Sequence, residues 1–291
     1  MEKPGKLRRV MKYFFVLVVW CLPLLTQAAQ PLKPLQIAEQ FVAKTGWADM
    51  KNYLSGEAAG QARSQSLGQQ IPASLERRCQ LLQQDQRTAV VAVELLDSVS
   101  RNDIYLHFRR DSTTAKAPWK LEAVRSLSMT QLGPPMLKLL TEMPPAEVAQ
   151  YNQKHPAAPH DFMLGNIRLW IGSDADIQRH FQRNQAAFQR AAQFIQTQQY
   201  FTAAPDTAGL GEQAANSAVE LQALLQPLYI SRVTRRYLGC ATCLEFIIGG
   251  VSGNTVGLFY QPKPEQVPAM TPDHIIVIKP LGNGWYLFKT T

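Results

Sequence analysis

Two cysteines late in the chain carry the clearest chemistry in the sequence. Cys240-Ala241-Thr242-Cys243 forms a C-x-x-C motif, which in an exported protein is typical of a thiol–disulfide oxidoreductase. In that class of enzyme a helix begins at the motif, and its positive end lowers the pKa of the first thiol. Here the motif precedes Leu244-Glu245-Phe246-Ile247-Ile248, which has the apolar and β-branched composition of a strand.

Chain geometry limits what these cysteines can form. Residues i and i+3 of an extended strand lie about 10 Å apart, whereas the Cα atoms of a disulfide are about 4.4 to 6.8 Å apart. A Cys240–Cys243 bond therefore requires a turn, which Leu238-Gly239 makes plausible. We expect a disulfide that closes the first hairpin of a C-terminal sheet. Pairing of Cys79 with one of the two, a catalytic dithiol, and Zn²⁺ held by three thiolates and a histidine are the alternatives; we expect no metal and no cofactor.

A second set of candidate groups lies on one face of a strand. Asp103–Arg110 alternates in polarity, which places Tyr105, His107 and Arg109 together, with Glu122 on a neighbouring strand. His107 and Glu122 are the residue types that perform acid–base catalysis in a pocket. The opposite face is apolar and should pack on helices. We therefore expect the polar face to lie in solvent, where cross-strand charge pairs are ordinary.

A small basic cluster, Arg232, Arg235 and Arg236, has the charge to bind an anionic ligand or lipid headgroups. A solvated strand face is the other interpretation of these three residues. The sequence contains no G-x-S-x-G, H-E-x-x-H, P-loop or dinucleotide-binding motif. These observations favour binding over catalysis.

The N-terminal residues predict the compartment. A basic stretch over residues 3–12 is followed by an apolar run, Tyr13–Leu25, and by Thr26-Gln27-Ala28-Ala29, the order of a secretory signal peptide. The run is shorter than the roughly 20 residues of a membrane-spanning helix. We expect residues 1–28 to be a cleaved signal peptide, with Met11 as an alternative start to Met1. The predicted location is the periplasm of a Gram-negative bacterium, or otherwise the outside of the cell.

Removal of that peptide changes the charge and the cysteine count. Residues 1–28 carry five basic residues and one acidic residue, so their loss lowers the net charge from +8 to +4. The remainder has no basic run of the kind that binds nucleic acid, and no segment apolar enough to span a membrane. Cys21 is lost as well, which leaves Cys79, Cys240 and Cys243 in an oxidising compartment.

The first module should occupy residues 31–132. Apolar spacing predicts two helices, around Leu35–Val42 and Trp47–Leu54, and then a loop over residues 55–74. An antiparallel meander of at least three strands should follow, over Thr88–Leu96, Asp103–Arg110 and Trp119–Leu127.

The rest of the chain should form a linker and a second module. Residues 133–160 are rich in proline and predict a linker with one short helix, Met136–Thr141. Residues 161–291 predict a long amphipathic helix capped by Ser173 or Asp174 and a second helix over Glu212–Leu225. Five strands should follow, with a hairpin at Gly282-Asn283-Gly284; they are Tyr229–Tyr237, Cys243–Ile248, Thr255–Gln261, His274–Lys279 and Trp285–Lys289. The predicted fold class is α+β, with two modules that each pack helices on an antiparallel meander.

The first module resembles a family of exported domains. Tyr105–Arg110 followed by Trp119–Arg125 is similar to the sheet of nuclear-transport-factor-2-like and cystatin-like domains. That resemblance implies a binding module, although some such domains are enzymes with an acid or a histidine in a cone-shaped pocket. The C-terminal segment resembles uncharacterised bacterial exported proteins, which implies no activity.

These observations predict a non-catalytic cell-envelope protein that binds another protein or a small ligand; an immunity-type protein that neutralises a toxin is one version. The alternative is a periplasmic enzyme, either an oxidoreductase that uses Cys240 and Cys243 or an acid–base enzyme in the first module.

Overall fold

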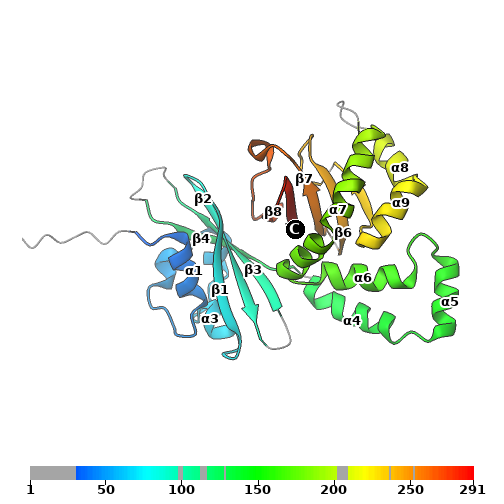
Figure 1. The fold of residues 1–291 in the computed structure, drawn as a ribbon. Helices are drawn as coiled ribbons and strands as arrows, with labels where there is room; N and C mark the ends of the chain where they lie inside the picture. The colour runs from blue at the N-terminus through cyan, green and yellow to red at the C-terminus, as the bar shows by residue number, and fades with distance from the viewer. Residues whose placement is uncertain are drawn as a thin grey trace, which may run out of the picture. The chain divides into compact units, whose positions relative to one another are not determined.

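The computed structural model describes residues 31–97, 101–111, 117–127, 129–201, 209–235, 237–251 and 253–291. The expected signal peptide, residues 1–28, lies outside the described residues. Residues 31–291 group into one compact unit, which contains a four-stranded and a five-stranded antiparallel sheet together with helices (Figure 1). The predicted α+β class is confirmed.

Short helices precede the first sheet; they are α1 (Pro34–Val42), η1 (Met50–Tyr53), α2 (Gly56–Gly60) and α3 (Leu67–Gln70). Of the apolar side chains predicted to share one face of α1, Ala38, Phe41 and Val42 are buried and Leu35 is partly buried. The second predicted helix is reduced to the single 3₁₀ turn η1, because the chain leaves it at Leu54 to bridge to Leu121. The predicted loop after it contains the two short helices α2 and α3.

The first sheet is a meander of β1 (Glu76–Gln84), β2 (Thr88–Leu96), β3 (Arg101–Arg109) and β4 (Lys120–Arg125), in that spatial order. The predictions for β2, β3 and β4 are confirmed to within a few residues. The edge strand β1 was not predicted, because most of its side chains are polar and only partly buried or exposed.

The two faces of this sheet are covered by different parts of the chain. On one face Val91, Leu106 and Phe108 are buried and belong to the core cluster that contains α1, as the alternation predicts. The expectation that the opposite face lies in solvent is wrong for Tyr105 and His107, whereas Arg109 is exposed. Tyr105 is 0% exposed and His107 is 2% exposed, because Tyr105 belongs to the second core cluster, built mostly from residues beyond 160. Local alternation cannot reveal a covering layer that comes from far along the chain.

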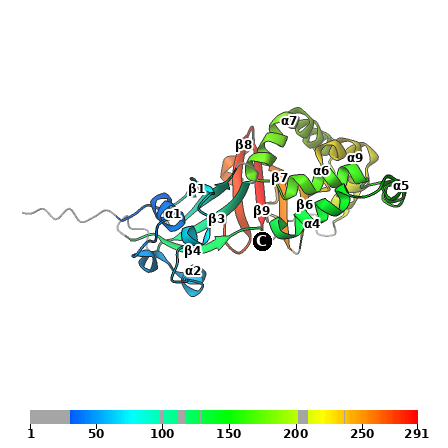
Figure 2. The same ribbon diagram turned by 90° about the horizontal axis from the view of Figure 1, so that it is seen from below.

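The first three helices after β4 are α4 (Met129–Thr141), α5 (Pro145–Lys154) and α6 (His160–Trp170). Residues 133–160 are therefore mainly helical, and Pro134 and Pro135 lie inside α4. Figures 1 and 2 show α4 and α6 side by side.

The long helix α7 (Asp174–Thr197) is the helix that the apolar spacing predicts most clearly. Ser173 is its N-cap and accepts a hydrogen bond from the backbone N–H of Asp176. Its apolar stripe, which includes Ile177, Phe181 and Phe188, is fully buried and packs against the second sheet through Trp285.

The second sheet follows α8 (Leu210–Ser217), α9 (Val219–Leu225) and η2 (Gln226–Leu228), so the predicted helix over residues 212–225 is interrupted at Ala218. Its strands are β5 (Arg232–Thr234), β6 (Leu244–Val251), β7 (Asn254–Tyr260), β8 (Ile275–Gly282) and β9 (Trp285–Thr290), with a 3₁₀ turn η3 (Pro264–Gln266) after β7.

The spatial order of the second sheet is β5-β6-β7-β9-β8. The last strand therefore lies between β7 and β8, which is the one departure from a simple meander. The predicted hairpin joins β8 to β9, and Gly282, Asn283 and Gly284 all have the positive φ that such a turn favours.

Candidate functional site

The C-x-x-C motif forms a disulfide-closed turn just before β6. Cys240 and Cys243 are bonded with a Cα–Cα distance of 5.3 Å, and the N–H of Cys243 donates to the carbonyl of Cys240 at 3.2 Å. Gly239 has a φ of 65°, which lets the chain enter the turn without steric strain. The structure thus contains the predicted disulfide and the turn that it requires.

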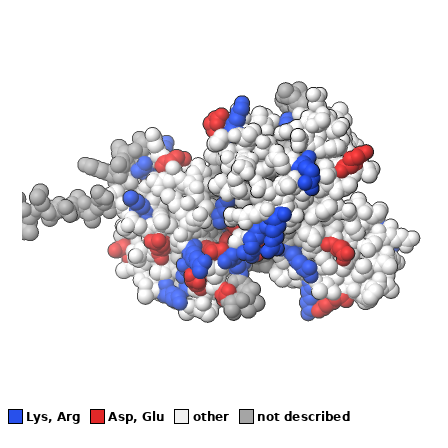
Figure 3. Space-filling model, in the orientation of Figure 1, with Lys and Arg blue, Asp and Glu red and all other residues white. Residues whose placement is uncertain are grey.

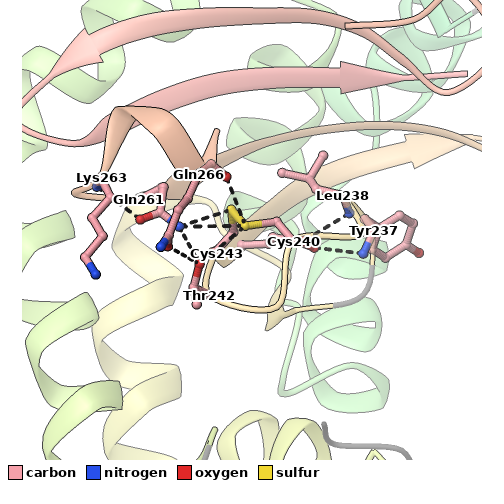
Figure 4. The surroundings of a disulfide bond; sticks show 9 residues. Tyr237, Leu238, Cys240, Thr242, Cys243, Gln261, Lys263 and Gln266 are labelled. Atoms are coloured by element: carbon pink, nitrogen blue, oxygen red, sulfur yellow. Dashed lines mark hydrogen bonds between the residues drawn. A yellow bond between two sulfur atoms is a disulfide. The ribbon is translucent and has the colours of Figure 1, made fainter. Parts of the chain in front are cut away.

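Side chains from the segment after β7 hold this turn in place (Figure 4). The amide Nε2 of Gln261 donates to Thr242 Oγ1 at 2.6 Å, and the Thr242 hydroxyl donates to Gln266 Oε1 at 3.0 Å. Gln261 is 1% exposed, and its Oε1 accepts the backbone N–H of Lys263 at 3.1 Å. Thr242 is therefore fixed by hydrogen bonds as well as by the covalent link around it.

A pocket of about 510 Å³ lies beside the turn. Its wall comes from the end of α7 and the residues just after it, from the connection between β5 and β6, and from the segment after β7. The lining combines four glutamine amides, two aromatic rings, the Thr242 hydroxyl and the cations Arg235 and Lys263. The guanidinium of Arg235 lies 5.2 Å from the ring centroid of Phe201. Such a lining forms hydrogen bonds, stacks and attracts negative charge.

A buried carboxyl group supports the segment that leads into the turn. Glu245 on β6 is 0% exposed and accepts the backbone N–H groups of Tyr237 and Leu238, each at 3.0 Å. Burial raises the pKa of Glu245 to about 7, and the two backbone hydrogen bonds offset part of that effect. The anchoring carboxyl group thus titrates near neutral pH.

Arg232 and Arg235 of the predicted basic cluster line different pockets. Arg235 lines the pocket beside the disulfide. Arg232 lines a different pocket of about 310 Å³, where its guanidinium hydrogen-bonds the hydroxyl of Tyr237. Arg236 lies outside the described residues. On the face drawn in Figure 3, several basic side chains gather near the middle with acidic side chains beside them, and the other charges are scattered.

His107 and Glu122, the predicted acid–base pair, have different surroundings. Burial lowers the pKa of His107 to about 4, and its ring Nε2 has no hydrogen-bond partner. Glu122 instead forms an ion pair with Arg109, with 3.3 Å between Oε1 and Nη1. The N-terminal module has a pocket of about 510 Å³ with apolar lining such as Phe41 and Leu54, and His107 is not part of that lining.

Sequence reasoning missed a buried charge cluster, formed by Asp103, Tyr105, Asp174, Lys279 and Lys289. The Lys289 ammonium lies 2.7 Å from Asp174 Oδ1 and the Lys279 ammonium 2.6 Å from Oδ2. The Tyr105 hydroxyl donates to Asp174 at 2.8 Å, and Asp103 accepts the backbone N–H of Asp174 at 2.7 Å. The cluster thus joins β3 to the first turn of α7 and to β8 and β9.

The sequence did contain a signal for this cluster. Lys279 and Lys289 each follow a run of apolar residues in a strand, Ile275–Ile278 and Trp285–Phe288, and a lysine in such a position needs a buried counter-ion or an edge. Burial alone raises the pKa of Asp174, but the two ammonium groups outweigh it and lower the pKa to about 2. The Asp174 carboxylate, the two ammonium groups and the Tyr105 hydroxyl contact one another, which is the arrangement of a structural ion cluster.

Cys79 on β1 is the free thiol of the described residues. Burial raises its pKa to about 12, so the thiol stays protonated at neutral pH and is a poor nucleophile. Within the described residues no group of three or more histidine, cysteine and acidic side chains is placed to hold a metal ion. In the same residues no helix has both the length and the apolar character needed to cross a membrane.

Comparison with known proteins gives no match to a protein-family model, to a curated protein or to a solved structure.

Proposed function

We propose that this chain is an exported, non-catalytic binding protein of the bacterial cell envelope. The observation that carries the proposal is the pocket beside the disulfide turn, whose lining of amides, aromatic rings and cations holds ligands rather than transfers protons. The resemblance of the first module to nuclear-transport-factor-2-like and cystatin-like domains accords with a binding role and stays a prediction.

Export has two sources of support. The order of basic, apolar and small residues in positions 3–29 is that of a signal peptide. A disulfide such as Cys240–Cys243 forms and persists in oxidising compartments. Expression in a Gram-negative bacterium, followed by fractionation and N-terminal sequencing, tests this part: we expect periplasmic protein that begins at Ala29 or Gln30. Cytoplasmic protein that retains residues 1–28 contradicts it.

Binding is tested in the native envelope. Chemical crosslinking followed by mass spectrometry should recover a defined partner or ligand adduct at lining residues of the pocket, with Lys263 the most reactive amine there. Crosslinking of the Gln261→Ala variant should give no such adduct, because Gln261 fixes Thr242 in the pocket wall. Adducts that are unchanged in this variant contradict binding at the pocket.

The oxidoreductase alternative rests on one observation, that the disulfide adjoins a pocket through Thr242. Against it, Cys243 is 0% and Cys240 9% exposed, and a strand follows the motif, so no helix dipole stabilises a thiolate. Alkylation of the reduced protein over a pH series separates the two functions. Non-catalytic cysteines give no thiolate reactivity below about pH 7.5, whereas a catalytic Cys240 reacts there.

A further inference from the structure

The pocket beside the disulfide turn has a wall that is fixed before any ligand arrives. Thr242 is held by the Cys240–Cys243 bond on both sides and by Gln261 and Gln266 through hydrogen bonds of 2.6 and 3.0 Å. Gln261 is in turn held through its backbone N–H, which donates to the carbonyl of Gly284 at 2.7 Å. A polar wall with so little freedom loses little conformational entropy on binding, which favours affinity for a small ligand.

The charge of the lining selects the class of ligand. Arg235 and Lys263 bring two positive charges to the pocket, and none of its described lining residues is Asp or Glu. Burial lowers the pKa of Arg235, which means that the guanidinium has given up part of its hydration. The planar guanidinium of Arg235 matches a carboxylate with two parallel hydrogen bonds.

Size and hydrogen-bonding capacity narrow the class further. A volume of about 510 Å³ falls within the range of small-molecule sites, roughly 300–1,000 Å³. Exposed amides of Gln196, Gln199 and Gln266 at the rim offer donors and acceptors that suit hydroxyl or amide groups of the ligand.

We propose that this pocket binds a small ligand that presents a carboxylate to Arg235 and Lys263 and hydroxyl or amide groups to the glutamine rim. The assignment rests on the proposed binding function and adds the chemistry of the ligand. A short peptide with a free C-terminus and an acidic sugar share this chemistry.

Titration calorimetry with two matched pairs of probes tests the assignment and separates these sources. The first pair is N-acetyl-trialanine with a free carboxylate and the same peptide as its C-terminal amide. The second pair is glucuronic acid and its uncharged methyl ester. For one pair the acid should bind the exported full-length chain at least about tenfold more tightly than its neutral counterpart, and added salt should reduce the difference.

Variants place the binding at the pocket. Lys263→Gln should reduce the affinity for the acid probe roughly threefold to tenfold. Arg235→Gln should reduce it by more, because the Arg235 charge is the more buried. Lys263 is exposed, so its variant keeps the test valid if Arg235→Gln disturbs the stacking on Phe201 and the fold. Lys44→Gln is the matched control: it removes the same charge from an exposed lysine of the first module and should leave affinity unchanged.

Three results overturn the assignment: equal affinity for acid and neutral probes, no binding of either acid at millimolar concentration, or unchanged affinity in Lys263→Gln. Envelope crosslinking separates these failures from failure of the proposed function. A defined partner that is recovered equally with wild type, Lys263→Gln and Arg235→Gln leaves a binding protein that works through another surface.

Discussion

The carboxylate of Asp174 is the group on which the buried charge cluster depends, and its removal should be costly. In Asp174→Asn the Lys289 ammonium, whose side chain is 3% exposed, is left with Asp103 at 4.0 Å as its remaining counter-ion. Lys279 loses its contact of 2.6 Å. Breaking a buried pair by removing one partner costs about 3–5 kcal/mol, so we expect a loss of that size in the free energy of unfolding.

The titration of Asp174 gives a second measure of the same interaction. A pKa lowered from 3.8 to about 2 corresponds to about 2 kcal/mol of stability. Because the folded-state pKa is depressed, this contribution is complete above pH 3.8 and is lost as the pH falls through about 2.

Urea unfolding followed by circular dichroism at pH 7 measures the loss. Arg179→Gln is the control: Arg179 pairs with Asp176 on the same helix, but the two side chains are 52% and 43% exposed, and such a pair contributes less than about 1 kcal/mol. A double-mutant cycle with Lys289→Met should give a coupling of roughly 1–3 kcal/mol. A loss in Asp174→Asn no greater than that in Arg179→Gln would refute the reasoning.

Other groups give further predictions. Burial raises the pKa of Glu245 from 4.5 to about 7, so its share of the stability, about 3 kcal/mol, is complete below pH 4.5 and is lost as the pH rises through 7; Glu245→Gln should flatten urea-derived stability over that interval, and an unchanged slope contradicts the assignment. The pKa of His107 is lowered from 6.5 to about 4, so its imidazole should remain neutral down to that pH in an NMR titration, and stability should decline as the pH falls from 6.5 toward 4. Replacing Cys240 and Cys243 with alanine should reduce the free energy of unfolding by about 2 kcal/mol, because the closed loop is short; a loss above about 4 kcal/mol would show that the turn does more than restrict the unfolded chain.

Features set by neighbouring residues could be predicted from the sequence. The capped start and apolar stripe of α7 follow a period that three or four residues define, and the structure has both. The same holds for the Gly282-Asn283-Gly284 hairpin and for the Cys240–Cys243 turn, which is forced by chain geometry once the bond exists. The sequence therefore favoured this disulfide, and the structure, in which Cys79 is a free thiol, excludes the alternative pairing.

Features set by distant residues could not be predicted. Tyr105 and His107 carry the alternation of a solvated strand face, yet both are buried, because residues more than 150 positions later cover them. The pocket beside the disulfide was missed for the same reason: its lining comes from three separated segments. Of the two cations in the pocket lining, the sequence pattern indicated only Arg235. Arg232, which was predicted to lie in one cluster with Arg235, is not part of the lining.

The position of β9 has a consequence for how the protein is made. The hydroxyl of Tyr105 and the ammonium of Lys289, which lie 3.0 Å apart, are 184 residues apart in the sequence, and β9 is inserted between β7 and β8. At about 5–20 residues per second, a ribosome needs roughly 10 to 40 s to add the second partner after the first. During that interval Val90, Ala92 and Tyr105 lack the part of their core cluster that β9 supplies, Trp285, Leu287 and Phe288. Exposed apolar surface of this kind attracts chaperones and aggregates readily, so yield in the cell should depend on chaperone supply until the final strand is in place.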